Sequence, residues 1–347
     1  MGFVPYPLGV ARIANKSASK AAAGELALIR LIRQRVPRAS RGEVRLGIGD
    51  DCALLRPRRG EEFAITTDLT IVGRHFWLAT HPPESIGHRA IARGLSDLAA
   101  MGARPVAAFV SLAVPGELAG KWTRRFYDGL LGLARAHRTT LAGGDVSEAL
   151  IPLADIVLVG SVPAGKALLR SGARPGEILY VTGTLGGSAA GLARLEEMAG
   201  PGRRSATRRR IATSDEPLTL HLHPQPRIAQ GLWLRRKGLA TAAIDLSDGL
   251  STDLAHLCEE SGVMAEIEAE RLPIHPGATL EQALNGGEDY ELLFTAPESA
   301  RVPRAIAGVP VTRIGRILGR SGRRPTITLK TASGSRPLQP AGWQHFA

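Results

Sequence analysis

Short acidic turns are the feature of this sequence that most strongly suggests chemistry. They follow apolar segments or lie beside glycines at 48–51 (IGDD), 66–68 (TTD), 95–97 (LSD), 143–145 (GGD), 245–248 (DLSD) and 286–289 (GGED). A single aspartate in a turn is ordinary, because its side chain bonds to nearby backbone. Several converging carboxylates repel one another and require a cation. Oxygen ligands without cysteine or histidine partners favour Mg²⁺, so the sequence predicts a magnesium site.

Magnesium held by carboxylates usually serves phosphate chemistry, because the metal bridges phosphate oxygens and offsets their charge. The glycine pairs at 143–144 and 286–287 fit this interpretation, since they let the backbone approach a ligand closely. The sequence contains no G-x-x-x-x-G-K-S/T loop, no protein-kinase signature and no G-x-S-x-G elbow. The GTLGGS segment at 183–188 has no acidic residue at the distance expected for a dinucleotide loop, so we do not expect NAD.

Apolar periodicity predicts the elements that must position these turns. In the first half, strands are expected at 45–55, 62–69, 106–115, 139–145 and 152–162, and helices at 25–36, 84–103 and 117–138. A second series of strands and helices begins at 178. Because the two types alternate in both halves, we expect an α/β or α+β protein with two domains. The expected divisions are a flexible leader at 1–24, an N-terminal domain at 25–163, and a C-terminal α/β domain at 164–347 with an Arg-rich loop at 200–216.

The composition is that of a globular protein without a membrane segment. Of the 347 residues, 44% are hydrophobic and 22% are charged. No run reaches the roughly 20 apolar residues that a membrane helix needs. The N-terminal segment has no continuous apolar core, and Cys52 and Cys258 lie in no metal or disulfide pattern. We therefore expect a cytoplasmic protein with no membrane partner.

The net charge of +12 raises the alternative of a basic nucleic-acid-binding protein. The densest basic cluster, at 203–210, has no interleaved aromatic residues on which bases could stack. It lies in a stretch rich in Gly, Ser and Thr that is typical of a solvated loop. We expect no nucleic-acid partner. Deletion of this loop would test the alternative, because it would abolish a function that depends on nucleic-acid binding but leave magnesium-dependent phosphate chemistry largely intact.

The acidic turns lie within longer motifs that occur in a characteristic order. These are LGIGDDCALL (46–55), LSDLAAMGA (95–103), AIDLSDGLSTDL (243–254) and GGEDYEL (286–292). Because it has these motifs in this order, the chain resembles the thiamine-monophosphate kinase family, and the resemblance extends from about residue 25 to residue 346. The resemblance implies a Mg²⁺-dependent kinase that transfers the γ-phosphate of ATP directly to thiamine monophosphate, giving thiamine diphosphate and ADP.

The same resemblance implies a homodimer. The N-terminal domains of two copies would pair their mixed sheets into a shared barrel, and each C-terminal α/β sandwich would pack alongside. ATP, as co-substrate, and several Mg²⁺ ions would lie in the cleft between the domains. No catalytic acid or base from the protein is implied, because the acceptor phosphate oxygen is already anionic near neutral pH.

Roles for individual residues follow from the positions that match the family's motifs. Magnesium ligands are implied at Asp51, Thr66, Thr67, Asp68, Asp97, Asp145, Asp245 and Asp248. Contacts to ATP are implied at Gly144, Asp145, Arg170 and Ser247. Contacts to thiamine monophosphate are implied at His75, Glu288 and Trp343. An arginine suits a phosphate ligand because its guanidinium binds as a fork, and a tryptophan face suits a cationic ring.

Two positions depart from the family's pattern, and neither removes a carboxylate. Gly94 stands where the family usually has Asn, which puts an amide contact near the metal site in doubt. Val146 follows GGD where the family tends to have threonine, so one hydroxyl is missing. A related ATP-dependent enzyme with a different acceptor remains an alternative. A catalytic cysteine or lysine near the N-terminus, as in selenophosphate synthetases, would favour it.

Overall fold

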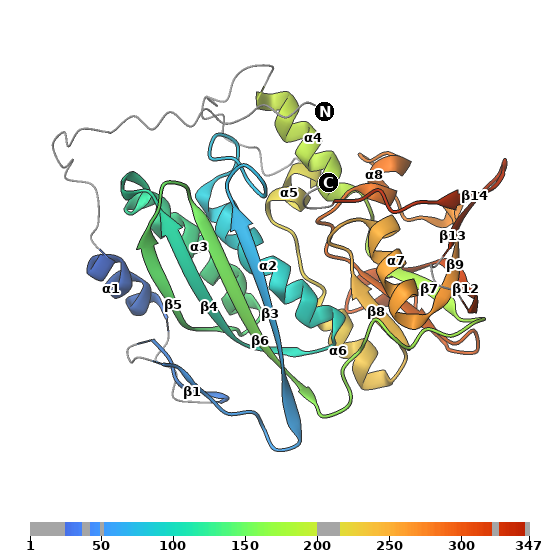
Figure 1. Cartoon of the computed structure of the whole chain (residues 1–347), viewed down its shortest axis with the longest axis horizontal. Coiled ribbons are helices and arrows are strands. Elements are labelled where there is room, and N and C mark those ends of the chain that lie inside the picture. Colours follow the sequence, from blue (N-terminus) through green and yellow to red (C-terminus); the bar gives the residue numbers. More distant parts are fainter. Residues whose placement is uncertain (1–24, 37–41, 49–51, 200–215, 321–325, 344–347) are drawn as a thin grey trace.

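The structure is a computed structural model that describes residues 25–36, 42–48, 52–199, 216–320 and 326–343. The expected leader, Asp51 and nearly all of the Arg-rich loop lie outside these residues. Within the described part, an N-terminal and a C-terminal β-sheet lie beside each other with helices between them (Figure 1). The chain is therefore a two-domain mixed α/β protein, as the alternation of strands and helices predicted.

The N-terminal sheet has four strands in the order β3-β6-β4-β5. β4 and β5 are parallel, and the other neighbouring pairs are antiparallel. The strands are β3 (Glu61–Ile71), β4 (Arg104–Val114), β5 (Thr140–Glu148) and β6 (Leu153–Pro163). Before them come helix α1 (Glu25–Arg35) and a separate pair of short strands, β1 (Val44–Leu46) and β2 (Leu54–Leu55). The single strand expected at 45–55 was wrong in this respect, because β1 and β2 pair with each other and not with the larger sheet.

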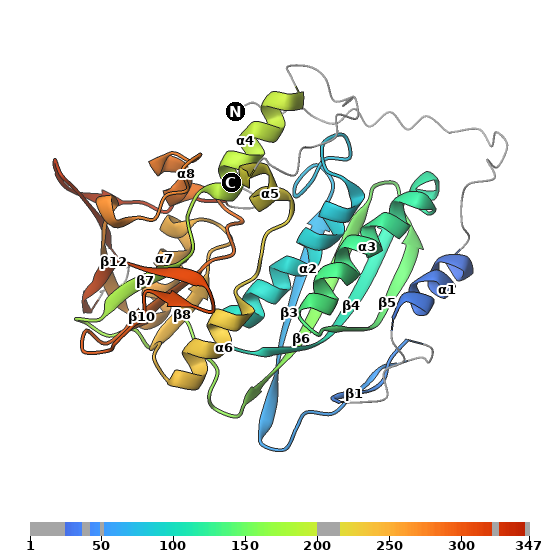
Figure 2. The same cartoon turned by 180° about the vertical axis from the view of Figure 1, so that it is seen from behind.

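Two helices, α2 (Pro83–Ala100) and α3 (Lys121–Ala136), cover one face of this sheet, as Figure 2 shows. α2 begins with Pro83, which has the φ that a first helical turn requires and no N–H to leave unpaired. Ile86, Leu95 and Leu98 lie at helical spacing on its buried side and are at most 1% exposed. The opposite face of the sheet is open over β3, β6 and β4 in Figure 1.

The C-terminal sheet has the strand order β14-β13-β9-β12-β7-β10-β8, with the short strand β11 paired to β12. Its strands are β7 (Ile178–Thr182), β8 (Ala242–Asp245), β9 (Val263–Glu268), β10 (Leu292–Ala296), β11 (Ala305–Ile306), β12 (Val309–Arg320), β13 (Ile327–Thr331) and β14 (Gly334–Leu338). The helices are α4 (Gly187–Ala199), α5 (Glu216–Leu222), α6 (Ile228–Lys237), α7 (Leu250–Ser261) and α8 (Leu280–Asn285). A separate apolar core lies within this domain and includes Leu254 and Leu257 of α7.

Helix α2 joins the two halves of the molecule. Its buried side belongs to the same apolar core as Ala243 of β8 and Phe294 of β10, which come from the C-terminal sheet. Next to this contact, the Ser96 hydroxyl of α2 donates a hydrogen bond of 2.7 Å to Asp245 Oδ2 at the end of β8. The fold thereby brings the LSD motif, which lies inside α2 and not in a turn, together with the DLSD motif at the end of β8.

No helix within the described ranges is long and apolar enough to cross a membrane.

Candidate active site

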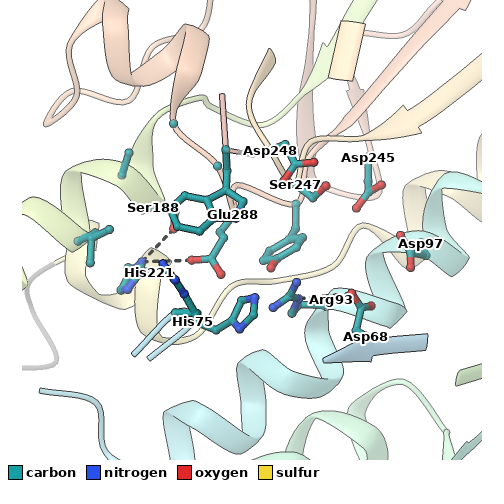
Figure 3. A pocket seen from close by; sticks show the side chains of 17 residues that line it. Asp68, His75, Arg93, Asp97, Ser188, His221, Asp245, Ser247, Asp248 and Glu288 are labelled. Carbon is teal, nitrogen blue, oxygen red and sulfur yellow. Dashed lines mark hydrogen bonds and ion pairs between the residues drawn. The ribbon is translucent and has the colours of Figure 1, made fainter. Parts of the chain in front are cut away.

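A cavity of about 450 Å³ lies where the two halves meet (Figure 3). β3, α2 and the segment after β3 contribute one side of it. The turn after β8, the segment 286–290 and helices α4 and α5 contribute the other. Residues predicted to bind metal and residues predicted to bind substrate both line this cavity.

Four of the predicted metal ligands share one part of the cavity: Asp68, Asp97, Asp245 and Asp248. They come from β3, α2, the end of β8 and the turn after it, so both halves of the chain contribute. Thr66 is close by, because its hydroxyl donates a hydrogen bond of 2.5 Å to Asp97 Oδ2. The bonds from Thr66 and Ser96 orient two of the four carboxylates towards the cavity.

The electrostatics of these carboxylates favour a bound cation. Burial, and then the neighbouring charges of Asp245 and Asp68, raise the pKa of Asp97. Burial also raises the pKa of Asp245, and burial raises that of Asp68 against the opposing charge of Arg93. The Oδ2 atom of Asp68 is buried and has no hydrogen-bond partner among the described residues. A buried oxygen without a partner and a group of like charges fit a hard divalent cation such as Mg²⁺.

Asp253 in the first turn of α7 fixes the turn that follows Asp245 and carries Asp248. Its Oδ2 accepts hydrogen bonds from the backbone N–H groups of Ser247, Asp248 and Gly249 at 3.0, 3.1 and 3.1 Å. The side chain is 2% exposed, so these bonds are shielded from water. Asp253 was not among the residues predicted from the sequence, although an acid in the first turn of a helix directly after an acidic loop is a recognisable signal.

Glu288 lies in another part of the same cavity and is held by a buried basic group. Arg89 Nη2 donates a bond of 2.5 Å to Glu288 Oε2, and Arg89 Nη1 lies 2.7 Å from His221 Nε2. Burial alone would raise the pKa of Glu288, but the guanidinium groups of Arg89 and Arg93 hold it below its usual range. Burial and the charge of Arg89 lower the pKa of His81 to about 3 and lower that of His221 as well. Glu288 is therefore an anion paired with an arginine beside neutral imidazoles.

The backbone around Glu288 has an unusual conformation. Glu288 and Tyr290 have positive φ values of 66° and 51°, which residues with side chains rarely adopt. Hydrogen bonds of 2.8 Å tie Glu288 N to Ser247 O and Tyr290 N to Leu246 O. The 286–290 segment is thus attached to the turn after β8. Strained backbone maintained by such bonds is typical of functional sites.

The other two predicted substrate residues also line this cavity. His75 Nδ1 accepts a bond of 3.0 Å from Ile71 N, which orients its ring. Trp343 is 47% exposed, and its backbone N–H donates to Asp248 O at 3.0 Å. Ser247, predicted to contact ATP, also lines the cavity, beside Asp248.

Asp145 and Thr67 lie away from this cavity, because strand register places them on the other face of the N-terminal sheet. Three cross-strand pairs connect Asp145 of β5 with Leu69 of β3. Asp145 lies opposite Ser111 of β4, Ser111 lies opposite Asp155 of β6, and Asp155 lies opposite Leu69. Directly opposite residues share a face, and Leu69 is one residue from Asp68, so Asp145 and Asp68 point to opposite sides. Thr67 also faces that side, and its hydroxyl donates to Asp155 Oδ1 at 2.8 Å.

Gly144 and Asp145 line a second cavity of about 490 Å³, together with Ile29 of α1 and Cys52. Gly144 has a φ of 145°, and a Cβ atom there would lie 2.0 Å from Val110 O. Only glycine allows this approach of β5 to β4.

Arg170, predicted to contact ATP, lines neither cavity, but its positive charge lowers the pKa of Asp97 and Asp245 against the effect of burial and so favours their ionised forms. Within the described chain, the predicted ligands therefore divide between two places.

Comparison with known proteins first defines the class. The N-terminal domain of AIR synthase related proteins matches residues 49–162, and their C-terminal domain matches residues 174–327. The chain is therefore an AIR synthase-related protein with both domains of that superfamily.

More similar relatives define the family within this class. The thiamine-monophosphate kinase of Escherichia coli K12 is 42% identical over 349 residues, covering 94% of this chain and 99% of that protein. The crystal structure of thiamine-monophosphate kinase from Stenotrophomonas maltophilia is 37% identical with a TM-score of 0.74, covering 88% of this chain and 97% of that one. A structure described as "AaThiL complexed with AMPPCP and TMP" is 32% identical with a TM-score of 0.71, covering 93% and 97%. The chain belongs to the thiamine-monophosphate kinase family.

Proposed function

We propose that the cavity between the two halves is where this kinase transfers the γ-phosphoryl group of ATP to thiamine monophosphate, giving thiamine diphosphate. The observation that carries the proposal is the joint lining of one cavity by Asp68, Asp97, Asp245 and Asp248 with Glu288, His75 and Trp343. The first group suits a metal-bound phosphate. The second suits an organic cation, because it offers an anion and an aromatic face.

The chain's own residues would bind and orient the reactants. Asp68, Asp97, Asp245 and Asp248 would hold Mg²⁺, which when bound offsets charge on the phosphates. Thr66 and Ser96 keep two of these carboxylates in place through the bonds described above. Glu288 would face the positively charged thiazolium ring. No protein base is needed, because the attacking oxygen belongs to a phosphate that is already ionised.

We also propose roles for the second cavity and for the open face of the N-terminal sheet. Gly144 and Asp145, with Asp51 outside the described residues, would contact ATP or its metals. The open face carries Ile65 and Leu69, which are 67% and 50% exposed. Large apolar side chains on a sheet face suit pairing with a second copy of the chain. This supports the expected dimeric barrel. The cytoplasmic location stays a prediction.

The test of the proposed function is a coupled assay of ADP release with purified protein, ATP and Mg²⁺. Thiamine monophosphate should support turnover, and removal of Mg²⁺ should abolish it. Free thiamine and aminoimidazole ribonucleotide precursors are the control acceptors. Turnover with one of these and none with thiamine monophosphate would establish the alternative of a related enzyme with another acceptor.

A further inference from the structure

Arg93 is a cation of the cavity that neither the predicted metal site nor the predicted substrate contacts include. It lies on α2 four residues before Asp97, so both side chains project from the same side of the helix. Figure 3 shows Arg93 between Asp68 and His75, and thus between the metal-type carboxylates and the predicted substrate residues. Its side chain is 20% exposed, in contrast to the exposed Arg74 at the rim.

The guanidinium of Arg93 has donors left over within the described structure. Its Nη1 donates to Leu69 O at 3.2 Å. Its Nε lies 3.5 Å from Asp68 Oδ1, which is an ion pair but too long for a good hydrogen bond. Arg89, one turn earlier, instead uses both terminal nitrogens on His221 and Glu288. Arg89 is therefore a positioning residue for Glu288, and Arg93 retains donors for a ligand.

The acidic groups around Arg93 keep its guanidinium positive, so Arg93 can offset the repulsion that these groups exert on an anion. Burial alone would lower the pKa of Arg93, but Tyr290, Asp68 and Glu288 raise it above the ordinary value. A substrate phosphate that enters beside Asp68, Asp97 and Glu288 meets three carboxylates. A guanidinium between them offsets this repulsion and offers paired N–H groups that match two phosphate oxygens.

We propose that Arg93 binds the phosphate of thiamine monophosphate and positions it between the carboxylate part of the cavity and Glu288. This inference rests on the proposed function. It also gives Arg93 a role in specificity. Unphosphorylated thiamine would leave the hydrogen-bond donors of Arg93 unpaired and would therefore bind more weakly. The nucleotide is the competing source of phosphate. The acceptor is favoured because Arg93 lies beside His75 and Glu288 rather than beyond Asp97 and Asp245.

The experiment measures the affinity of Arg93→Met for thiamine monophosphate and for thiamine, in Mg²⁺ and without nucleotide. We expect thiamine monophosphate to bind about ten- to a hundredfold more weakly, the usual effect of losing a charged hydrogen-bonded pair. Thiamine affinity, measured by competition, should change by less than about threefold, because thiamine has no phosphate. Arg93→Lys should recover part of the loss, since it keeps the charge but not the fork. Arg124→Met, on the exposed side of α3, is the matched control.

Three results would overturn the inference. Unchanged affinity of Arg93→Met for thiamine monophosphate would show that the residue does not bind its phosphate. Equal losses for thiamine monophosphate and thiamine would show a structural role. Weaker binding of a non-hydrolysable ATP analogue, with thiamine monophosphate unaffected, would assign Arg93 to the nucleotide. If the wild-type protein binds no thiamine monophosphate, the proposed function fails as well, and the two failures are therefore distinguishable.

Discussion

Each carboxylate of the cavity carries a negative charge that a neutral side chain of the same shape cannot provide for a divalent ion. Asp97→Asn keeps the size of the side chain but removes a charge that a divalent ion needs. We expect kcat to fall at least about a hundredfold, since even residues that only orient a metal ligand matter at that level. Melting temperature should stay the same or rise, because the repulsion between Asp97 and Asp245 is relieved. Turnover near the wild-type rate would remove Asp97 from the site. Asp128→Asn, half-exposed on α3, is the control.

The raised pKa of Asp97 predicts how pH and magnesium act together on stability. Burial and the charges of Asp245 and Asp68 raise this pKa to about 7, whereas an unfolded aspartate has roughly 3.9. The folded state therefore holds the proton more tightly, and its stabilising effect is present below about pH 4 and lost as pH rises towards 7. Mg²⁺ competes for the ionised form and should raise the melting temperature more at about pH 8 than at about pH 5. Equal shifts at both pH values, or the same difference in Asp97→Asn, would contradict this.

The residue types of the site were predictable from the sequence, but their partners were not. Asp68, Asp97, Asp245, Asp248 and Glu288 stand out because they follow apolar segments or lie beside glycines. Nothing in the sequence indicated that Arg89 would bond to His221 and Glu288, since 132 and 199 residues separate Arg89 from these two partners. Such contacts depend on which elements pack together. At Gly94, a Cβ atom would lie 3.1 Å from Leu158 Cγ, so a larger side chain at this position requires the Leu158 side chain to shift by a few tenths of an ångström.

At the scale of elements, the turn between β8 and α7 depends on one buried acid. Asp253→Ala removes the acceptor of three backbone N–H groups. We expect the free energy of unfolding to fall by about 1–3 kcal/mol, the cost of leaving buried donors unpaired. Mg²⁺ affinity should also fall, because Asp245 and Asp248 lose their fixed positions. Asp253→Asn should recover part of both, since it keeps an oxygen acceptor. Loss of stability with unchanged Mg²⁺ affinity would restrict Asp253 to a structural role. Both quantities can be measured by denaturant unfolding and calorimetry.

The arrangement of the strands explains why the sequence could not predict that the proposed metal ligands lie on two faces of the N-terminal sheet. The strands that carry GGD and TTD were predicted correctly, as β5 and β3, but both motifs lie within these strands and not in turns after them. Their places in the sheet were not predictable, because the order β3-β6-β4-β5 puts them at opposite edges. Register then turns Asp145 to the other face from Asp68. The alternation of residues along a strand predicts which side chains share a face of the sheet. It does not predict the order of the strands or which face meets the second domain.

For the whole molecule, the open face of the N-terminal sheet leads to a prediction about assembly. Ile65→Arg places a charge on the face that we propose to pair with a second copy. We expect the dimer to dissociate to monomers in analytical ultracentrifugation, because a buried unpaired charge opposes association. Met198→Arg on α4, where the side chain is 46% exposed, should leave the dimer intact. A wild-type protein that is monomeric at all concentrations would remove the barrel from the account.

The proposed phosphoryl transfer depends on carboxylates from both halves of the chain, which would share divalent ions with the two substrates. The most direct measurement is anomalous diffraction from crystals grown with Mn²⁺, a non-hydrolysable ATP analogue and thiamine monophosphate. We predict anomalous peaks in contact with Asp68, Asp97, Asp245 or Asp248, and thiamine monophosphate beside Glu288 in the same cavity. Fully bound substrates with no metal peak at any of these four carboxylates would contradict it.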